Sequence, residues 1–242
     1  MILLTGGAGT LGTELKKYLK HHYSPSRKDL DITSNPKSWD IVGKEIIPEY
    51  LREAPSLIVH AAAFTDLVRA EKEKDLCYAT NVLGTRNLAS LGIPMLYIST
   101  EYVFDGTKGN YVEEDYANPL NFYALTKLLG EYEARKAPGS VVVRCLFKPR
   151  PFRHEFACTD QFTSGSYADQ IAPEIAWAIQ NFDKLPPTIH IGSGRKSTWE
   201  LARESRPDVK PCKVGDIGTV RLPRDTSLNA EKWKELRNGN KA

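Results

Sequence analysis

Residues 1–12 read MILLTGGAGTLG, and this stretch decides the fold class. Its first four side chains are apolar, as in a strand buried on both faces of a parallel sheet. Glycines follow at positions 6, 9 and 12, and Leu11, Leu15 and Leu19 then come at helical spacing. A strand, a glycine turn and a helix in this order are typical of a dinucleotide-binding unit, in which the backbone approaches a pyrophosphate at the helix N-terminus. We therefore expect the cofactor to contact Gly6, Gly9, Thr10, Leu11 and Gly12.

The alternation of strand and helix continues along the chain. The patterns predict strands near residue 23 and over 56–60, 93–99 and 141–144, with helices over about 35–52, 67–91 and 121–132 between them. This order predicts an α/β fold with a doubly wound parallel sheet of the Rossmann type. After residue 146 the pattern weakens to helices over 169–181 and 198–205, a short strand over 188–191, and a final helix after 229.

Three segments follow from this organisation. We expect an NADP-binding Rossmann domain over residues 1–146 and a reduced substrate-binding region over 147–237 that is partly interleaved with the sheet. We expect residues 238–242 to form a disordered tail.

Composition narrows the class of protein. The 242 residues are 41% hydrophobic and 26% charged, with a net charge of +3 from basic residues that are spread along the chain. This pattern favours neither nucleic acid nor a membrane surface. Four cysteines lie far apart and the five histidines have no metal-ligand spacing, so we expect free thiols and no metal. With no apolar run approaching 18 residues, a cytoplasmic location is expected.

Residues 26–28 favour one dinucleotide over the other. NAD-binding sites often carry an acid here to hold the ribose hydroxyls, whereas this chain has Ser26 and Arg27. A hydroxyl and a guanidinium suit a 2′-phosphate, so NADP(H) is expected as the preferred cofactor, with NAD(H) as the second choice. Asp31 and Ile32 follow slightly later and are placed beside the adenine.

Small residues end the next strand. Ala61, Ala62 and Ala63 would let a cofactor lie flat against the backbone at the carboxyl edge of the sheet. Asn81 lies among apolar neighbours in the predicted 67–91 helix, and a buried asparagine needs partners. It either bonds the backbone near the active site or bridges helix and strand.

A tyrosine and a lysine one helical turn apart supply candidate chemistry. Tyr123 and Lys127 share one helix face, where an ammonium would favour the phenolate and lower the tyrosine pKa. Thr100 ends a strand at the same sheet edge and could hold a substrate oxygen. Tyr-x-x-x-Lys alone is common by chance, but here it follows the glycine turn and the alanine segment. A loose basic group (Lys148, Arg150 and Arg153) would border a site for an anionic ligand.

Together these motifs resemble the extended short-chain dehydrogenase/reductase superfamily, and within it the dTDP-4-dehydrorhamnose reductase-like family of sugar-nucleotide reductases. The matching pieces are TGGAGTLG at 5–12, LDIT at 30–33, HAAAFT at 60–65, STEYVFDG at 99–106 and PLNFYALTKLLGE at 119–131, with later echoes in DQF at 160–162 and DTSL at 225–228.

The resemblance implies a role for each catalytic residue. Tyr123 would protonate the new alkoxide, Lys127 would lower its pKa and hold the nicotinamide ribose, and Thr100 would bond the reacting carbonyl of a 4-keto-6-deoxy sugar nucleotide. It adds further cofactor-binding residues (Thr65, Asn81 and Ser99) and substrate residues (Glu101, Tyr102, Phe147, Lys148, Arg150 and Arg153).

Two departures from the family stand out. Glu101 replaces the usual aspartate, and Tyr102 occupies the position where related 4,6-dehydratases need a second carboxyl group, so dehydration is disfavoured. The region after Arg144 is shortened and basic.

The sequence thus favours an NADPH-dependent reductase of a nucleotide-activated 4-keto sugar, but it leaves two alternatives open. One is a non-catalytic NADP-binding regulatory subunit, which the shortened substrate region would suit but the intact Thr100, Tyr123 and Lys127 argue against. Another is an NAD-dependent sugar-nucleotide epimerase, against which Arg27 counts. The expected partner is a small-molecule nucleotide sugar, and a homodimer is compatible with the sequence.

Overall fold

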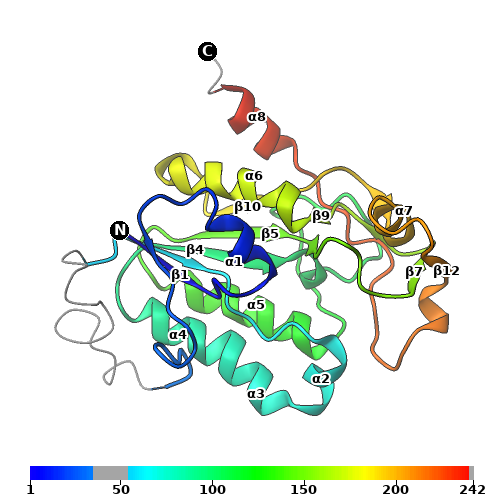
Figure 1. Cartoon of the computed structure of the whole chain (residues 1–242), viewed down its shortest axis with the longest axis horizontal. Helices are drawn as coiled ribbons and strands as arrows, with labels where there is room; N and C mark the ends of the chain where they lie inside the picture. Colours follow the sequence, from blue (N-terminus) through cyan, green and yellow to red (C-terminus); the bar gives the residue numbers. More distant parts are fainter. Residues whose placement is uncertain (35–53, 240–242) are drawn as a thin grey trace.

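A six-stranded, all-parallel sheet forms the centre of the computed structural model, which describes residues 1–34 and 54–239. The strand order is β10-β5-β4-β3-β1-β2, and helices cover both faces (Figure 1). The predicted doubly wound α/β fold is therefore confirmed. The strands are β1 (Ile2–Thr5), β2 (His22–Tyr23), β3 (Leu57–His60), β4 (Met95–Thr100), β5 (Val141–Cys145) and β10 (Thr188–His190).

The side chains of each strand point alternately to the two faces of the sheet, so the apolar core forms two layers. Leu4 packs into a cluster with Ile175 of α6 (Ala168–Gln180), on the face that also carries α1 (Thr10–Leu15) and α8 (Glu231–Gly239). Its neighbour Leu3 points to the opposite face and packs with Leu88 of α4 (Gly84–Ala89), beside α5 (Phe122–Ala134). Successive strand side chains point to opposite faces, so a sheet covered on both sides needs apolar residues at consecutive positions.

The segment predicted as one helix over 67–91 is interrupted. It forms α2 (Leu67–Lys72), α3 (Lys74–Tyr78), a π-helical turn η2 (Ala79–Leu83) and α4. Glu73 separates the first two with φ −106° and ψ 52°, outside the helical region. The apolar spacing predicted helix correctly but did not reveal the break. The helix predicted over 35–52 lies outside the described residues.

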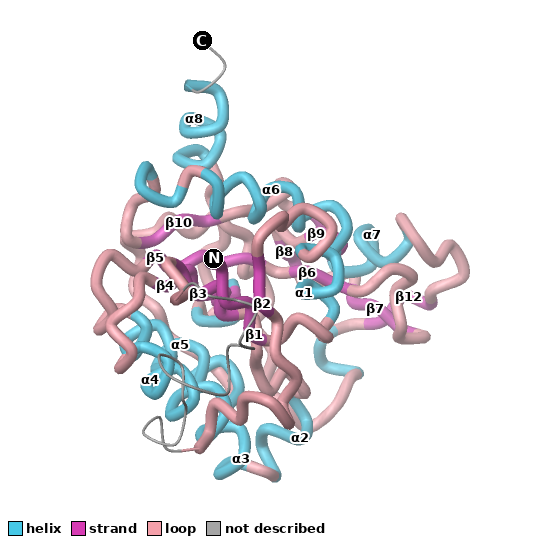
Figure 2. The backbone as a smooth tube through the Cα atoms, turned by 60° about the vertical axis from the view of Figure 1, so that its left-hand side comes forward, coloured by secondary structure: helices cyan, strands magenta, loops and turns pink. Residues whose placement is uncertain are grey.

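The region after β5 contributes both to the sheet and to a separate layer beside it. Strand β10 extends the parallel sheet and helix α6 packs on one of its faces, as the predicted strand and helix indicated. The remainder forms short ladders that lie beyond the sheet, with β7, β12 and α7 farthest from it (Figure 2). They pair β6 (Phe147–Lys148) with β9 (Ser166–Tyr167), β7 (Phe156–Cys158) with β12 (Lys210–Cys212), and β8 (Phe162–Thr163) with β11 (Lys196–Ser197).

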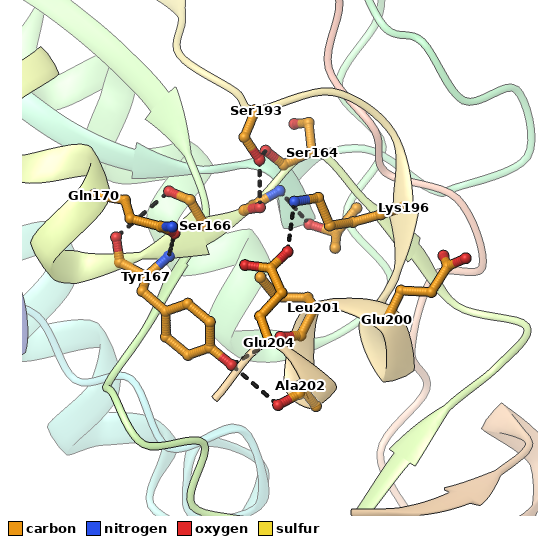
Figure 3. Close-up of polar contacts among 12 residues, drawn as sticks. Ser164, Ser166, Tyr167, Gln170, Ser193, Lys196, Glu200, Leu201, Ala202 and Glu204 are labelled. Atoms are coloured by element: carbon orange, nitrogen blue, oxygen red, sulfur yellow. Dashed lines mark hydrogen bonds and ion pairs between the residues drawn. The ribbon is translucent and has the colours of Figure 1, made fainter. Parts of the chain in front are cut away.

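Helix α7 (Thr198–Arg203) is tied to β9 by side-chain contacts (Figure 3). The hydroxyl of Tyr167 donates toward the carbonyl oxygens of Leu201 at 2.8 Å and Ala202 at 3.2 Å, at the end of this helix. An ion pair of 2.9 Å joins Lys196 to Glu204 nearby. The Tyr167 ring is fully buried, so the small region has an anchored core of its own. Short 3₁₀ turns complete the described elements: η3 (Glu101–Val103), η4 (Phe182–Lys184) and η5 (Val214–Asp216).

The C-terminal helix corrects the predicted tail boundary. Helix α8 runs through Gly239, so Asn238 and Gly239 are its last residues rather than part of a disordered tail, and residues 240–242 lie outside the described residues. Its Trp233 packs edge-on against Trp177 of α6, with ring centroids 5.3 Å apart. Within residues 1–34 and 54–239, no helix has both the length and the apolar composition that crossing a bilayer requires.

Candidate active site

A cleft of about 960 Å³ runs along the carboxyl edge of the sheet. Ligands in open α/β sheets bind at this edge. The glycine turn after β1 lines it at one part, and the alanine segment after β3 and the end of β4 line it farther along. Tyr123 and Lys127 of α5 also face it. The structure therefore brings the predicted phosphate turn and the predicted catalytic residues into one continuous site.

The glycines of the turn are required by close backbone packing. Gly6 has a φ of +74°, and a Cβ there would lie 2.5 Å from the backbone nitrogen of Ala62. A Cβ at Gly12 would lie 2.3 Å from the carbonyl oxygen of Gly6. The turn consequently sits directly against the alanine segment, and Gly9, Thr10 and Leu11 at the start of α1 line the cleft beside it, together with Ala61, Ala62, Ala63 and Thr65.

The residues predicted to select the cofactor lie at another part of the same cleft. Ser26, Arg27, Asp31 and Ile32 all line it, and the Arg27 side chain is exposed to solvent. The carboxylate of Asp31 accepts hydrogen bonds from the hydroxyl and backbone amide of Thr33 at 2.7 and 3.0 Å. These bonds lower the Asp31 pKa, so the group is ionised at neutral pH.

The catalytic candidates are placed by one strand end and one capped helix. Thr100 ends β4, and its hydroxyl oxygen accepts a 3.2 Å hydrogen bond from the backbone amide of Tyr102. Asn121 caps α5 by accepting a 2.9 Å bond from the Ala124 amide, which fixes the start of the helix that carries Tyr123. Lys127 donates from Nζ to the carbonyl oxygen of Ile98 at 2.8 Å.

Burial sets the pKa values of the tyrosine and the lysine. It raises the pKa of Tyr123, and a hydrogen bond with Thr100 opposes only part of this rise. Burial lowers the pKa of Lys127 to about 7, against the attraction of the Glu131 carboxylate. Desolvation therefore determines the direction of the net shift, and the expected lowering of the tyrosine pKa by Lys127 stays a prediction. A phenol that keeps its proton at neutral pH suits a proton donor.

A buried ion pair lies next to the end of β4 and is bonded by Ser99 of that strand. The Arg144 guanidinium binds the Glu131 carboxylate through two hydrogen bonds of 2.9 and 2.8 Å. The hydroxyl of Ser99 donates to the same carboxylate at 2.6 Å. Ser99 lines the cleft as predicted. Its hydroxyl already donates to Glu131, so that hydrogen is not available to a ligand.

Glu101, which the resemblance assigned to the substrate, does not line the cleft. Its side chain is fully buried and accepts hydrogen bonds from Thr226 at 2.7 Å and from the amide and hydroxyl of Ser164 at 3.3 Å. Burial raises its pKa to about 7 despite these donors. Glu101 thus joins the end of β4 to the C-terminal region instead of facing a ligand.

Two further residues lie outside the cleft lining. Arg150 is exposed, pairs with Asp169 at 3.2 Å and stacks 4.1 Å from the Tyr167 ring centroid. Asn81 is buried and is used by the protein: its oxygen accepts from the Phe64 amide at 2.8 Å, and its nitrogen donates to the Thr126 hydroxyl at 2.9 Å. Of its two predicted roles, Asn81 has the first, a backbone bond next to the site.

The other end of the cleft is formed by η3 and by the segment from the end of β5 onward. Tyr102, Phe147, Lys148 and Arg153 line it, as the sequence predicted for the substrate side. Cys145, Phe152 and His154 line it too and were not predicted, because a cysteine ending a strand and residues in an irregular loop carry no spacing signal. Among the described residues, no group of three or more His, Cys, Asp or Glu side chains could hold a metal ion.

The parallel sheet, the glycine turn and the Thr100–Tyr123–Lys127 arrangement define a protein of the short-chain dehydrogenase/reductase class. Within that class, the chain belongs to the family described as RmlD substrate binding domain, whose model matches residues 1–147.

Named relatives agree with this family. A dTDP-4-keto-6-deoxy-D-glucose reductase of Streptomyces niveus is 36% identical, over 96% of this chain and 90% of the relative. A dTDP-4-dehydrorhamnose reductase of Sinorhizobium fredii is 33% identical over 59% of this chain, and the match spans only about half (49%) of that protein's length. The crystal structure of dTDP-4-dehydrorhamnose reductase from Bacillus anthracis in complex with NADP has a TM-score of 0.76 and 26% identity, covering 98% of this chain and 91% of that one.

Proposed function

We propose that this protein is an NADPH-dependent reductase of a nucleotide-activated 4-keto (deoxy)sugar. One observation carries the proposal: a single cleft is lined by the glycine turn, the alanine segment and the Thr100, Tyr123 and Lys127 side chains. A dinucleotide that lies along the first two would bring its reactive ring to the third. The reductase names and the NADP complex of the relatives support the same chemistry.

The cleft suits a phosphorylated dinucleotide. The packing of Gly6 against Ala62 leaves backbone rather than side chains along this part of the cleft, which is what a pyrophosphate and a flat ring system require. Arg27 is exposed at the cleft lining beside Ser26, where a guanidinium would bind a 2′-phosphate. When bound, NADPH supplies the hydride for the carbonyl carbon.

The protein's own residues complete the reduction. The Tyr123 hydroxyl donates its proton to the carbonyl oxygen as negative charge develops there, and the Thr100 hydroxyl bonds the same oxygen. The raised pKa of Tyr123 keeps that proton available across neutral pH. In its protonated form, Lys127 stabilises the phenolate that is left.

The substrate side of the cleft favours an anionic group. Arg153 and Lys148 line this end, and burial lowers the Lys148 pKa. The diphosphate of a nucleotide sugar would meet the Arg153 guanidinium there, together with the Lys148 ammonium when it is protonated. Tyr102 and Phe147 offer ring surface beside them.

The test is a turnover assay with NADPH oxidation as the readout and a panel of nucleotide 4-keto sugars as substrates. Tyr123→Phe should lower kcat by roughly 10²–10⁴-fold, since the proton donor is lost, and should leave NADPH binding nearly unchanged. Tyr132→Phe, on the exposed side of the same helix, is the matched control and should retain wild-type kcat. Full activity in Tyr123→Phe would reject the proposal.

The cofactor preference is tested in the same assay by titrating NADPH and NADH. Arg27→Ala should weaken NADPH binding by about tenfold and leave NADH binding unchanged. The loss of one charge-assisted hydrogen bond to the 2′-phosphate raises the dissociation constant by about that factor. Lys28→Ala controls for the loss of a neighbouring charge. Tighter binding of NADH than NADPH by the wild type would refute the assignment of Arg27.

A homodimer is also proposed. Leu125 and Tyr132 are both exposed apolar side chains on α5 and lie seven residues apart, on one helix face. Sedimentation velocity of the wild type beside Tyr132→Lys tests it, and a monomeric wild type would reject it.

A further inference from the structure

The outermost ladder of the C-terminal region contains two paired cysteines. Cys158 ends β7 and Cys212 ends β12, and the two residues are register partners in this parallel pair. Their sulfur atoms are 3.4 Å apart. The backbone around them is well bonded, since the Thr159 amide donates to the Cys212 carbonyl at 3.0 Å and the Thr198 hydroxyl donates to the Cys158 carbonyl at 2.9 Å.

We propose that Cys158 and Cys212 form a reversible disulfide bond, so that this ladder is a redox-modification site. Neighbouring strands are about 4.8 Å apart, within the ~4.4–6.8 Å that Cα atoms of a disulfide span. The sulfurs are already in contact, so the bond needs movement of the side chains alone. This proposal does not depend on the proposed reductase activity.

The two thiols differ in access, which sets the order of events. Cys212 is partly exposed, whereas Cys158 is buried. Burial and the neighbouring Cys212 raise the pKa of Cys158 to about 12, so its thiol is protonated and a poor first nucleophile. An oxidant from solvent would therefore react at Cys212.

The reaction balances with a small disulfide such as oxidised glutathione. The Cys212 thiolate attacks one glutathione sulfur, which breaks the glutathione S–S bond and releases one glutathione thiolate. Cys158 loses its proton to that leaving thiolate and attacks the Cys212 sulfur, which releases the second glutathione. Two cysteine thiols are oxidised to one disulfide, and one oxidised glutathione is reduced to two thiols.

The bond would link positions 54 residues apart in the sequence, a stretch that contains α6, β10 and α7. Closing a long loop in the unfolded chain stabilises the folded state, so oxidation should raise the melting temperature. A cross-strand bond with one exposed partner belongs to the class that is readily reduced, which fits a reversible role.

Peptide mapping tests the bond directly, because trypsin leaves the four cysteines in four different peptides: 75–86, 145–153, 154–184 and 204–213. The full chain is equilibrated with excess oxidised glutathione, blocked with iodoacetamide and digested without reduction. We expect peptides 154–184 and 204–213 to be joined, dithiothreitol to separate them, and the melting temperature of the oxidised protein to be higher by roughly 5–15 °C.

Two variants keep the test decisive. Cys212→Ser, at the partly exposed position, should abolish the linked peptide and the temperature shift, whereas Cys77→Ser should retain both. The proposal is overturned if the wild type keeps free thiols under these conditions, if Cys212 stops at a stable glutathione adduct, or if Cys77→Ser also loses the link.

Discussion

The parallel-sheet half and the region after β5 are held together by different kinds of contact. Strands β3, β4 and β5 are buried along their whole length between two apolar layers. The later region has ladders of two or three residues, and many of its buried side chains are polar: Gln161, Thr163, Ser164, Ser166, Thr226 and Ser227. Burial of apolar surface between two layers thus places the proposed catalytic residues, whereas in the later region hydrogen bonds act beside a smaller apolar cluster that includes Leu146, Phe152 and Tyr167.

The two regions meet at Glu101. Its backbone directly follows Thr100 at the end of β4, and its carboxyl group accepts hydrogen bonds from Ser164 and Thr226 of the later region. Because this buried carboxyl group can ionise, the contact between the two regions should depend on pH. Three experiments measure how far this contrast holds.

The largest effect is expected at a buried ion pair, where the sheet half holds two charged side chains inside its mostly apolar core. Arg144 and Glu131 form a buried ion pair beneath β4, with side chains only 6% and 1% exposed. Arg144→Ala would leave the carboxylate buried without its bidentate partner, and we expect a loss of about 3–5 kcal/mol in the free energy of unfolding. Urea denaturation followed by circular dichroism measures it.

Lys136→Ala is the matched control, because Lys136 pairs with Glu133 on the same helix end at a side-chain exposure of 61%. Exposed pairs contribute little, so no measurable change is expected. A loss below about 1 kcal/mol in Arg144→Ala would mean that Arg135, 3.6 Å from Glu131, compensates alone.

The next effect concerns the junction and depends on pH. Burial raises the Glu101 pKa from its ordinary 4.5 to about 7, so the folded protein binds this proton more tightly than the unfolded chain. The stability that the group contributes is full below about pH 4.5 and is lost as the pH rises through 7, by on the order of 3 kcal/mol. Glu101→Gln should therefore be more stable than the wild type at pH 8 by up to that amount, and similar at pH 5.

The difference between the two unfolding curves isolates Glu101. Burial lowers the pKa of His60 to about 3 and of His190 to about 4, which destabilises the fold in acid, but both histidines are present in both proteins and cancel. Parallel stability profiles from pH 5 to pH 8 would show that Glu101 is ionised in the folded state, and the junction would then be an ordinary hydrogen-bonded contact.

The same contrast explains what the sequence could predict. The apolar runs, the glycine spacing and the Tyr123–Lys127 interval are local patterns with a fixed period, and they predicted the sheet, α5 and the part of the cleft that the glycine turn, Tyr123 and Lys127 line. Ladders of two or three residues have no period to detect. The buried partners of Glu101 are 63 and 125 residues away in the chain, so no local pattern could show that it faces away from the cleft.

The sequence also could not show whether burial or a neighbouring charge would dominate the pKa of Tyr123. The interval between Tyr123 and Lys127 predicted correctly that both face the cleft, but the sign of the tyrosine shift depends on how deeply the ring is buried. Arg150 shows the same limit, because its basic neighbours suggested an anion site and only the fold reveals Asp169 beside it.

The smallest effect compares one helix cap from each region. Asn121 caps α5 through a 2.9 Å bond to the Ala124 amide, and Ser197 caps α7 through a 3.1 Å bond from the Glu200 amide. Asn121→Ala and Ser197→Ala should each lower the free energy of unfolding by about 1 kcal/mol, since each leaves a helix amide without its acceptor.

The effects of these two substitutions on turnover should differ. Helix α5 carries Tyr123, so fraying of its first turn should displace the proposed proton donor and lower kcat. Helix α7 lies outside the cleft lining, so the loss of its cap should leave kcat unchanged. Equal kcat losses in the two variants would show that the region after β5 positions the proposed catalytic residues as strongly as the sheet does. The contrast between the two regions would then apply to stability alone.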